Sequence, residues 1–232
     1  MKKQPITGLV PMRHSSERVK GKNYRLFAGI PLYHHIVRAL LNSRTIGQVV
    51  IDTDSHFIQE DASRNFPSVV LLERPHYLRG GAVPMNDVLL HTVQLLEEDF
   101  FLQTHSTNPL LSSQTIDRAV ETFWEAQPDK DSLFSVTRLQ TRLWKEQSQP
   151  LNHDPAVLMR TQDLPPVFEE NSNMYIFSAE SLRRRGSRIG ANPLMFEMEA
   201  RESVDIDEEL DFQIAEFFFK HKNQESACPS RS

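Results

Sequence analysis

Cysteine is almost absent from this chain. Its 232 residues include one cysteine, Cys228, close to the C-terminal end. A single thiol cannot form an intrachain disulfide framework, and it cannot supply a zinc site that needs several thiolates. We therefore expect a protein of a reducing compartment, and the prediction for its location is the cytoplasm.

Long hydrophobic runs are also missing. No apolar stretch approaches the roughly 20 residues that a membrane-spanning helix needs. The N-terminus reads Met-Lys-Lys-Gln-Pro and continues into a short apolar stretch that stops at Arg13, which is too short for the core of a signal peptide. We therefore predict no membrane partner.

Glycine is scarce, at 8 residues, and the familiar catalytic signatures are missing. The chain contains no GxGxxG, no GxxxxGK followed by Ser or Thr, no GxSxG and no HExxH. These absences exclude the usual dinucleotide fingerprint, the Walker P-loop, the serine-hydrolase elbow and the zincin helix.

Positive charge is in the minority. Lys and Arg number 26 against 31 Asp and Glu, so the net charge is −5 with neutral His. An acidic chain is a poor non-specific binder of nucleic acid. Four arginines lie close together at Arg183, Arg184, Arg185 and Arg188, but no aromatic residues alternate with them. Cations near a helix C-terminus are a common solvated feature. We predict no nucleic-acid partner.

Short apolar runs alternate with segments of helical periodicity. Strands are expected at 6–11, 48–53, 69–72, 100–105, 133–137, 173–177, 194–198 and 202–206. Helices are expected at 32–41, 56–65, 84–98, 114–126 and 208–219, the last of them burying Leu210, Ile214, Phe217 and Phe218. Strands that alternate with helices predict an α/β protein, with a Rossmann-like, mostly parallel sheet covered by helices on both faces.

One segment interrupts this alternation. Residues 138–172 are rich in Gln, Pro, Arg and Asn and have weak periodicity, so we predict an excursion that serves as an arm, a lid or a pairing surface. The expected organisation is a single α/β domain over residues 1–220 that includes this excursion. A flexible tail is expected over 221–232.

The turn after the first expected strand is strongly basic. Arg13, Arg18, Lys20 and Lys22 fall within ten residues there, and Ser15, Ser16 and Asn23 add neutral hydrogen-bonding groups. In a parallel α/β sheet, ligands gather at the carboxyl ends of the strands. Such a loop suits a polyphosphate, and the alternative is an exposed, solvated loop.

A pair of carboxylates lies near the end of the chain, in Ser-Val-Asp-Ile-Asp at 203–207. If this segment is a strand, Asp205 and Asp207 point to the same face and can reach one hard cation. Magnesium usually takes one or two protein carboxylates and completes its shell with water and phosphate oxygens. The alternative is that Asp207 caps the helix that follows. A basic loop and a metal pair together indicate nucleoside-triphosphate chemistry.

Three motifs resemble those of the acylneuraminate cytidylyltransferases, the CMP-sugar synthetases. The phrase R-x-x-S-x-R-x-x-G-K-N begins at Arg13 and is similar to the family's signature after its first strand. RTQDLPPVFEEN at 160–171 resembles the family segment RxQDLPxxxxxN, and SVDID resembles its metal-binding ending. The resemblance covers about residues 5–220, in the family's order, and implies a nucleotide-diphospho-sugar transferase fold.

The resemblance also implies roles for individual residues. Those that match CTP-binding positions are Arg13, Ser16, Lys22, Asn23, Arg74 and His105. Those that match acceptor-side positions are Lys145, Gln162 and Asn171, and the magnesium ligands, which manganese can share, match Asp205 and Asp207. Arg13, Lys22 and Asp207 are the expected catalytic groups. The family is typically a homodimer that exchanges the excursion across its subunit contact.

Four departures concern the pocket. His14-Ser15 replaces the family's glycine pair, and Gly81-Ala82 replaces Asp-Thr. The glutamine of the QPTSP stretch matches His105, with Gln103 as the alternative. Glu169 stands where sialic-acid enzymes often have an arginine near the acidic sugar. The predicted reaction joins CTP to an acidic 2-keto-3-deoxy sugar of the nonulosonate type and gives CMP-sugar and pyrophosphate. The alternatives are a related nucleotidyltransferase with another triphosphate or acceptor, and a catalytically silent nucleotide-binding homologue.

Overall fold

A seven-stranded sheet forms the centre of the computed structural model, which describes residues 4–16 and 18–221. Its strands lie in the order β11-β7-β10-β6-β1-β4-β5. Their bounds, in that order, are Pro193–Glu197, Ser132–Leu139, Val167–Ser178, Phe100–Thr104, Ile6–Met12, Ile46–Thr53 and Val70–Glu73. Only β10 runs antiparallel to its neighbours β6 and β7. The predicted, mostly parallel α/β sheet is therefore confirmed.

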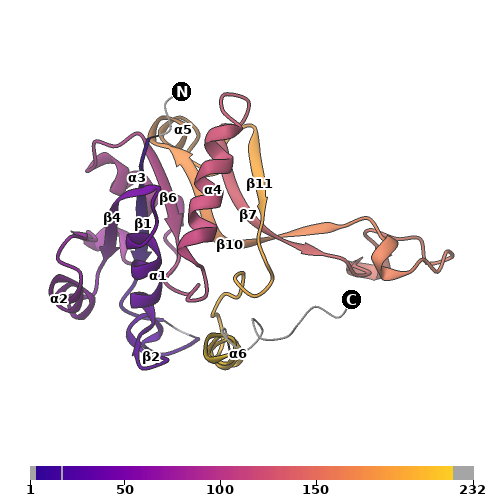
Figure 1. Ribbon diagram of the computed structural model, residues 1–232, viewed down its shortest axis with the longest axis horizontal. Helices are drawn as coiled ribbons and strands as arrows, with labels where there is room; N and C mark the ends of the chain where they lie inside the picture. The colour runs from indigo at the N-terminus through magenta and orange to yellow at the C-terminus, as the bar shows by residue number, and fades with distance from the viewer. Residues whose placement is uncertain (1–3, 17, 222–232) are drawn as a thin grey trace.

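Helices cover both faces of the sheet (Figure 1). Their bounds are Leu32–Leu41 for α1, His56–Asn65 for α2, Met85–Gln94 for α3, Ser113–Glu125 for α4, Ala179–Arg185 for α5 and Glu209–Lys220 for α6. Successive strand residues point to opposite faces, so Val10 packs with α1, α2 and α4 while Leu9 packs with α3 and α5. None of the helices among the described residues is long and apolar enough to cross a membrane.

The excursion predicted over residues 138–172 is an arm. The outer ends of β7 and β10 leave the sheet as a paired ribbon that projects away from the body (Figure 1). Its far end holds the small strands β8, Trp144–Lys145, and β9, Gln149–Pro150. Because β10 already pairs with β7 along the arm, it begins at Val167 rather than at the expected residue 173.

Two short segments complete the fold beside the sheet. The strands β2, Leu26–Phe27, and β3, Ile30–Pro31, form a small hairpin after the basic loop. A third apolar cluster joins Phe27 of this hairpin to Phe212 and Ala215 of α6. This packing holds the C-terminal helix next to the segment that follows β1.

The strand predicted over 202–206 is wrong. The backbone N–H groups of Glu202 and Ser203 both donate to the carbonyl of Glu199, at 3.0 and 3.1 Å, and so close a turn. These two N–H groups are therefore not available to pair with a neighbouring strand, and the chain leaves the sheet after β11. The predicted flexible tail lies outside the described residues from 222 onward.

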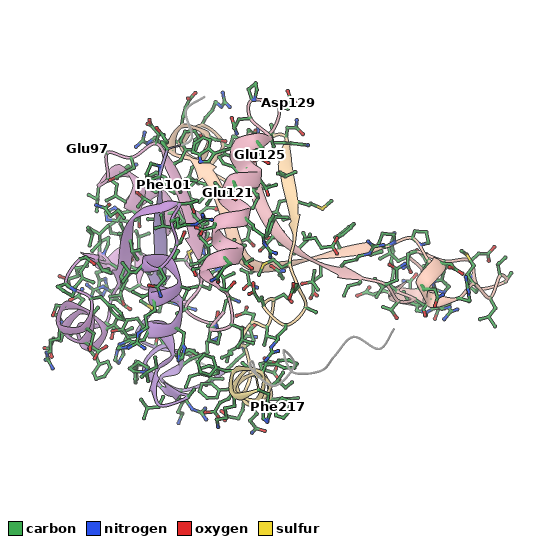
Figure 2. The ribbon with its side chains drawn as sticks, in the orientation of Figure 1. Glu97, Phe101, Glu121, Glu125, Asp129 and Phe217 are labelled. Carbon is green, nitrogen blue, oxygen red and sulfur yellow. The ribbon has the colours of Figure 1, made fainter. Side chains whose placement is uncertain are left out.

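The buried face predicted for the last helix is also largely wrong. Leu210, Ile214 and Phe217 are 63%, 39% and 57% exposed, whereas Phe212 and Ala215 are buried. Figure 2 shows Phe217 at the outer edge of the molecule. The helix has apolar residues on two sides, and the side that meets Phe27 is the one that becomes core.

Candidate functional site

A polar cleft of about 440 Å³ lies at the carboxyl ends of β1 and β6. Its lining includes basic, hydroxyl and acidic residues from separate parts of the chain: Arg13, Ser15, Ser16, Arg18, Lys22, Asn23, Gly81, Met85, His105, Thr107, Ser172, Arg188, Asp205 and Asp207. The fold thus brings together the basic loop and the carboxylate pair, which are more than 180 residues apart in the sequence.

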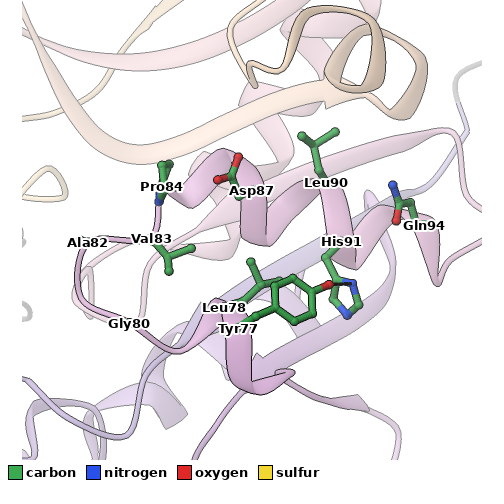
Figure 3. Close-up of a pocket in the computed structure, with 10 residues that line it drawn as sticks. All are labelled: Tyr77, Leu78, Gly80, Ala82, Val83, Pro84, Asp87, Leu90, His91 and Gln94. Atoms are coloured by element: carbon green, nitrogen blue, oxygen red, sulfur yellow. Dashed lines mark hydrogen bonds between the residues drawn. The ribbon is translucent and has the colours of Figure 1, made fainter.

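Another hollow, of about 580 Å³, lies between α3 and the short helix η2 at His76–Leu78 (Figure 3). Tyr77, Leu78, Val83 and Leu90 give it a largely apolar wall. Its lining includes Ala82 but none of the residues predicted to bind nucleotide, acceptor or metal, and it has no lysine or arginine to bind a phosphate. The polar cleft is therefore the better candidate for a phosphate-binding site.

The basic loop folds back on itself after β1. Gly21 has a left-handed backbone with φ of 63°, and a Cβ there would lie 2.7 Å from the Tyr24 ring. Glycine is favoured for both reasons. The turn returns Asn23 to the strand end, where its Nδ2 donates to the carbonyl of Arg13 at 2.7 Å. Ser106 donates to Asn23 Oδ1 at 2.7 Å, so Asn23 fixes the loop to the end of β6.

The carboxylate pair meets this loop directly. Arg18 Nη2 and Lys22 Nζ lie 2.7 and 3.6 Å from Asp207 Oδ1. Lys22 also donates to the carbonyl of Ile206, and the Ile206 N–H donates to the carbonyl of Thr107 at 3.0 Å. The segment 205–207 is irregular, so the two carboxylates share the cleft because of these hydrogen bonds and not because of a strand.

Asp207 does not cap α6. The N-cap residue is Glu208, whose side chain and that of Asp211 form a reciprocal capping box. Asp211 Oδ2 accepts from the backbone N–H groups of Asp207 and Glu208 at 3.0 and 2.8 Å. The Asp207 side chain is therefore left to the cleft, and the helix-capping alternative is wrong.

The two carboxylates fit a magnesium ion that is shared with phosphates. Asp205 Oδ1 is buried and has no hydrogen-bond partner among the described residues. Burial raises the pKa of the Asp205 carboxyl and lowers the pKa of the Lys22 ammonium, because desolvation disfavours the charged form of each group. Within the described chain no group of three His, Cys, Asp or Glu could bind a metal by itself. A hard cation held by two carboxylates needs phosphate or water oxygens as well.

His105 lies between two cations and is neutral. Burial, followed by the charges of Arg188 and Lys22, lowers its pKa to about 3. Gln103 Nε2 donates to His105 Nε2 at 3.1 Å, so the ring proton is assigned to Nδ1. His105 thus offers the cleft an uncharged N–H donor, where the family's glutamine would offer an amide.

Arg74 lies outside the cleft. Its side chain is 2% exposed, and its Nε is 2.6 Å from Asp52 Oδ1. Asp52 Oδ2 accepts in turn from Thr92 Oγ1 at 2.7 Å. The structure therefore places Arg74 in a buried ion pair that ties β5 to β4, away from the residues that line the cleft.

The acceptor-side residues are separated. Lys145 and Gln162 are exposed on the arm, and neither lines the cleft. Asn171, at the base of the arm, accepts from Ser135 Oγ at 2.6 Å and donates to Thr137 Oγ1 at 3.0 Å. It lines a hollow of about 340 Å³ that shares Ser172, Asp205 and Asp207 with the cleft.

The departures from the family pattern have distinct positions. His14 does not line the cleft: its N–H donates to Asp54 Oδ1 at 2.6 Å, and its Nδ1 is 2.8 Å from Ser55 Oγ. Gly81 lines the cleft, and Glu169 lines the adjoining hollow. Ser15, Gly81 and His105 thus reach the cleft and Glu169 reaches the hollow beside it, whereas His14 fixes the loop to the start of α2.

Arg188 is a further residue of the cleft, outside the motifs of the sequence. Arg183, Arg184 and Arg185 are exposed, as their interpretation as a solvated cluster requires. Arg188 instead lines the cleft, with its guanidinium carbon 3.5 Å from the ring centroid of Tyr175. No motif marks it, because it reaches the site through the fold of the segment between α5 and β11.

Known proteins resemble this chain over nearly its whole length. A family model described as cytidylyltransferase matches residues 7–225. The chain is 28% identical to an N-acylneuraminate cytidylyltransferase A of Danio rerio over 222 residues, covering 93% of this chain but only 51% of that relative. It is also 28% identical to a CMP-N,N'-diacetyllegionaminic acid synthase of Legionella pneumophila, covering 91% of this chain and 94% of the relative.

Solved structures show the same fold. A CMP:2-keto-3-deoxy-manno-octonic acid synthetase complexed with CTP superposes with a TM-score of 0.69 at 13% identity, covering 94% of this chain and 99% of that one. The sequence motifs, the sheet and the family match agree over the same residues. The chain therefore belongs to the cytidylyltransferase family, and the resemblance found in its sequence is confirmed.

Proposed function

We propose that this protein is a nucleotidyltransferase that joins CTP to an acidic 2-keto-3-deoxy sugar of the nonulosonate type, giving CMP-sugar and pyrophosphate. The observation that carries the proposal is the meeting of Arg13, Arg18 and Lys22 with Asp205 and Asp207 in one cleft. The names of the zebrafish and Legionella relatives support the choice of CTP and of this class of sugar.

The reaction needs no protein nucleophile. A hydroxyl oxygen of the acceptor attacks the α-phosphorus, a new P–O bond forms, the bond to pyrophosphate breaks, and the hydroxyl proton is released to solvent. Catalysis is then positioning and charge stabilisation. Arg13 and Lys22 neutralise charge on the phosphates, while Ser16, Asn23 and the N–H of His105 supply hydrogen bonds to the nucleotide.

Asp205 and Asp207 would hold the magnesium ion, or manganese in its place. A metal bound there would neutralise phosphate charge and align the reacting oxygens. Arg18 and Lys22 lie beside Asp207. The cations and the carboxylates are therefore within reach of the same phosphate groups.

A homodimer and a cytoplasmic location belong to the same proposal. The arm exposes a group of apolar side chains at Trp144, Leu151, Val157, Leu158 and Met159, and Leu158 is 91% exposed. Large apolar side chains gathered on a projecting segment are typical of an interaction surface. In this arrangement Lys145 and Gln162 act at the partner's acceptor site.

Thermal stability tests the nucleotide half of the proposal. The protein is melted with CTP, UTP, ATP and GTP, each with and without magnesium. A nucleotide at about 100 times its dissociation constant stabilises by roughly 2.7 kcal/mol, equivalent to a rise of about 5–10 °C for a chain of this size. Selective stabilisation by CTP with magnesium is expected.

Other results of this experiment lead to different conclusions. If another triphosphate raises the melting temperature more than CTP does, the assignment of cytidylyl transfer is wrong while the fold assignment stands. If CTP binds but no acidic sugar yields pyrophosphate, the chain is a silent nucleotide-binding homologue. Asp207→Asn is expected to reduce turnover by orders of magnitude without loss of folding, and unchanged turnover would remove the metal role.

A further inference from the structure

Arg188 is held rigidly in the wall of the cleft. Its guanidinium lies over the ring of Tyr175, and Nη1 donates to Gln103 Oε1 at 2.5 Å. Its backbone N–H donates to Asn86 Oδ1 at 3.3 Å. Tyr175 of β10 and Gln103 of β6 thus fix the side chain of Arg188, while Asn86 of α3 holds its backbone.

Arg188 forms no ion pair within the described part of the chain. Glu170 has a favourable charge interaction with it, but the Glu170 carboxylate accepts the hydroxyl of Tyr175. Burial lowers the pKa of Arg188, so the half-buried charge is unfavourable in the free protein. An anionic group in the cleft would remove that cost.

Arg188 lies apart from the cations assigned to CTP. Arg13, Arg18 and Lys22 all come from the loop after β1 and line the cleft together. Arg188 instead stacks on β10, and the hydroxyl of Tyr175 beneath it contacts Ser172 at 3.2 Å. Ser172 lines both the cleft and the adjoining hollow. Arg188 and Tyr175 are therefore on the side of the cleft next to the hollow, away from the basic loop.

The chemistry of the side chain favours a carboxylate. A guanidinium has five N–H donors in a planar fork, so its bond to Gln103 leaves donors for a ligand. The fork matches the two oxygens of a carboxylate, and stacking on an aromatic ring leaves the donor edge accessible. Glu169 and Glu170 also line the adjoining hollow, so that hollow does not by itself attract an anion.

We propose that Arg188, stacked on Tyr175 and bonded to Gln103, binds the carboxylate of the acidic acceptor. The assignment rests on the proposed function, because it presupposes an acidic second substrate in this cleft. It makes Arg188 the residue that selects acidic acceptors over neutral ones.

The test compares Arg188→Gln and Arg188→Lys with a matched control, Arg185→Gln. Arg185 is exposed in the last turn of α5, three residues from Arg188. Calorimetry measures binding of N-acetylneuraminic acid, of 2-keto-3-deoxy-manno-octonic acid and of their C1 amides to each protein without nucleotide. A second titration measures CTP with magnesium, and melting curves verify that each variant is folded.

We expect Arg188→Gln to weaken binding of the acid that the wild type binds best by at least about 30-fold, since truncation of one partner of a buried charge pair costs at least ~2 kcal/mol. Binding of its amide changes little, CTP affinity stays within about twofold, and Arg185→Gln behaves like the wild type. Arg188→Lys recovers part of the acid affinity, because it keeps the charge but loses the planar fork.

Two results would overturn the proposal. If Arg188→Gln weakens CTP and leaves acid binding unchanged, Arg188 belongs to the triphosphate site. If the acid and the amide lose affinity equally, the residue shapes the pocket without reading the carboxylate. Failure of the proposed function has a different signature, because wild-type protein would then bind no CTP or release no pyrophosphate.

Discussion

Replacement of Asp205 by Asn is expected to stabilise the free protein while it removes the response to ligand. Asp205 Oδ1 is buried without a hydrogen-bond partner, and the hydroxyl of Thr107 bonds to the carboxyl group. An unsatisfied buried polar atom costs about 1–3 kcal/mol, and more if it is charged. Asn keeps the shape and removes the charge, so Asp205→Asn should recover about 1 kcal/mol.

This gain is measurable by calorimetry or circular dichroism. For a chain of this size, about 1 kcal/mol raises the melting temperature by roughly 2–4 °C. In the same assay, CTP with magnesium should raise the melting temperature of the wild type by about 5–10 °C. It should hardly change that of Asp205→Asn, because one of the two metal ligands is now neutral.

A matched control separates these effects from a general change of charge. Asp129→Asn removes one carboxylate from the exposed end of the molecule that Figure 2 labels, so neither the melting temperature nor the ligand response should change. The reasoning is refuted if Asp205→Asn melts below the wild type. It is equally refuted if CTP with magnesium stabilises that variant as strongly as it stabilises the wild type.

Three further predictions concern stability and assembly. Arg74→Ala should lower the free energy of unfolding by about 3–5 kcal/mol in urea titrations, because it leaves Asp52 buried and unpaired; an unchanged value would contradict the buried pair. Asp117→Asn should cost about 1.5–3 kcal/mol at pH 7. Burial acts to raise the pKa of Asp117, but hydrogen bonds from the segment 43–45 outweigh it and hold that pKa below its ordinary 3.8. The stability lost in Asp117→Asn should therefore shrink as the pH falls below 3.8. A loss of stability that does not depend on pH would refute this account. Leu158→Glu, on the 91% exposed arm residue, should shift the proposed dimer toward monomer in sedimentation velocity, whereas an unchanged sedimentation coefficient would place the dimer contact elsewhere.

The alternation of strands and helices was readable from the sequence because it depends on local periodicity. The predicted limits of α1 and α2, at 32–41 and 56–65, agree with the structure. Each of these helices has one dominant apolar face, so local pattern and tertiary packing select the same residues. The family and its fold followed from motifs that are short and continuous along the chain.

The features that the sequence did not reveal depend on contacts between residues that are far apart in the chain. Helix α6 has apolar residues on two sides, so its sequence does not show which side is buried. The contact of Phe27 with Phe212 selects the buried side. In the sequence Arg74 matches a residue that binds nucleotide. In the fold it lies beside the buried carboxylate of Asp52 and forms an ion pair with it in the core.

The cleft itself is a product of both levels. The basic loop and the carboxylate pair could be recognised from the sequence, because each lies within a few consecutive residues. Only the fold could add Arg188, which joins the site through Tyr175 and Gln103 on neighbouring strands. A stacking contact between residues that are far apart in the sequence has no local signature, and for that physical reason the sequence could not reveal it.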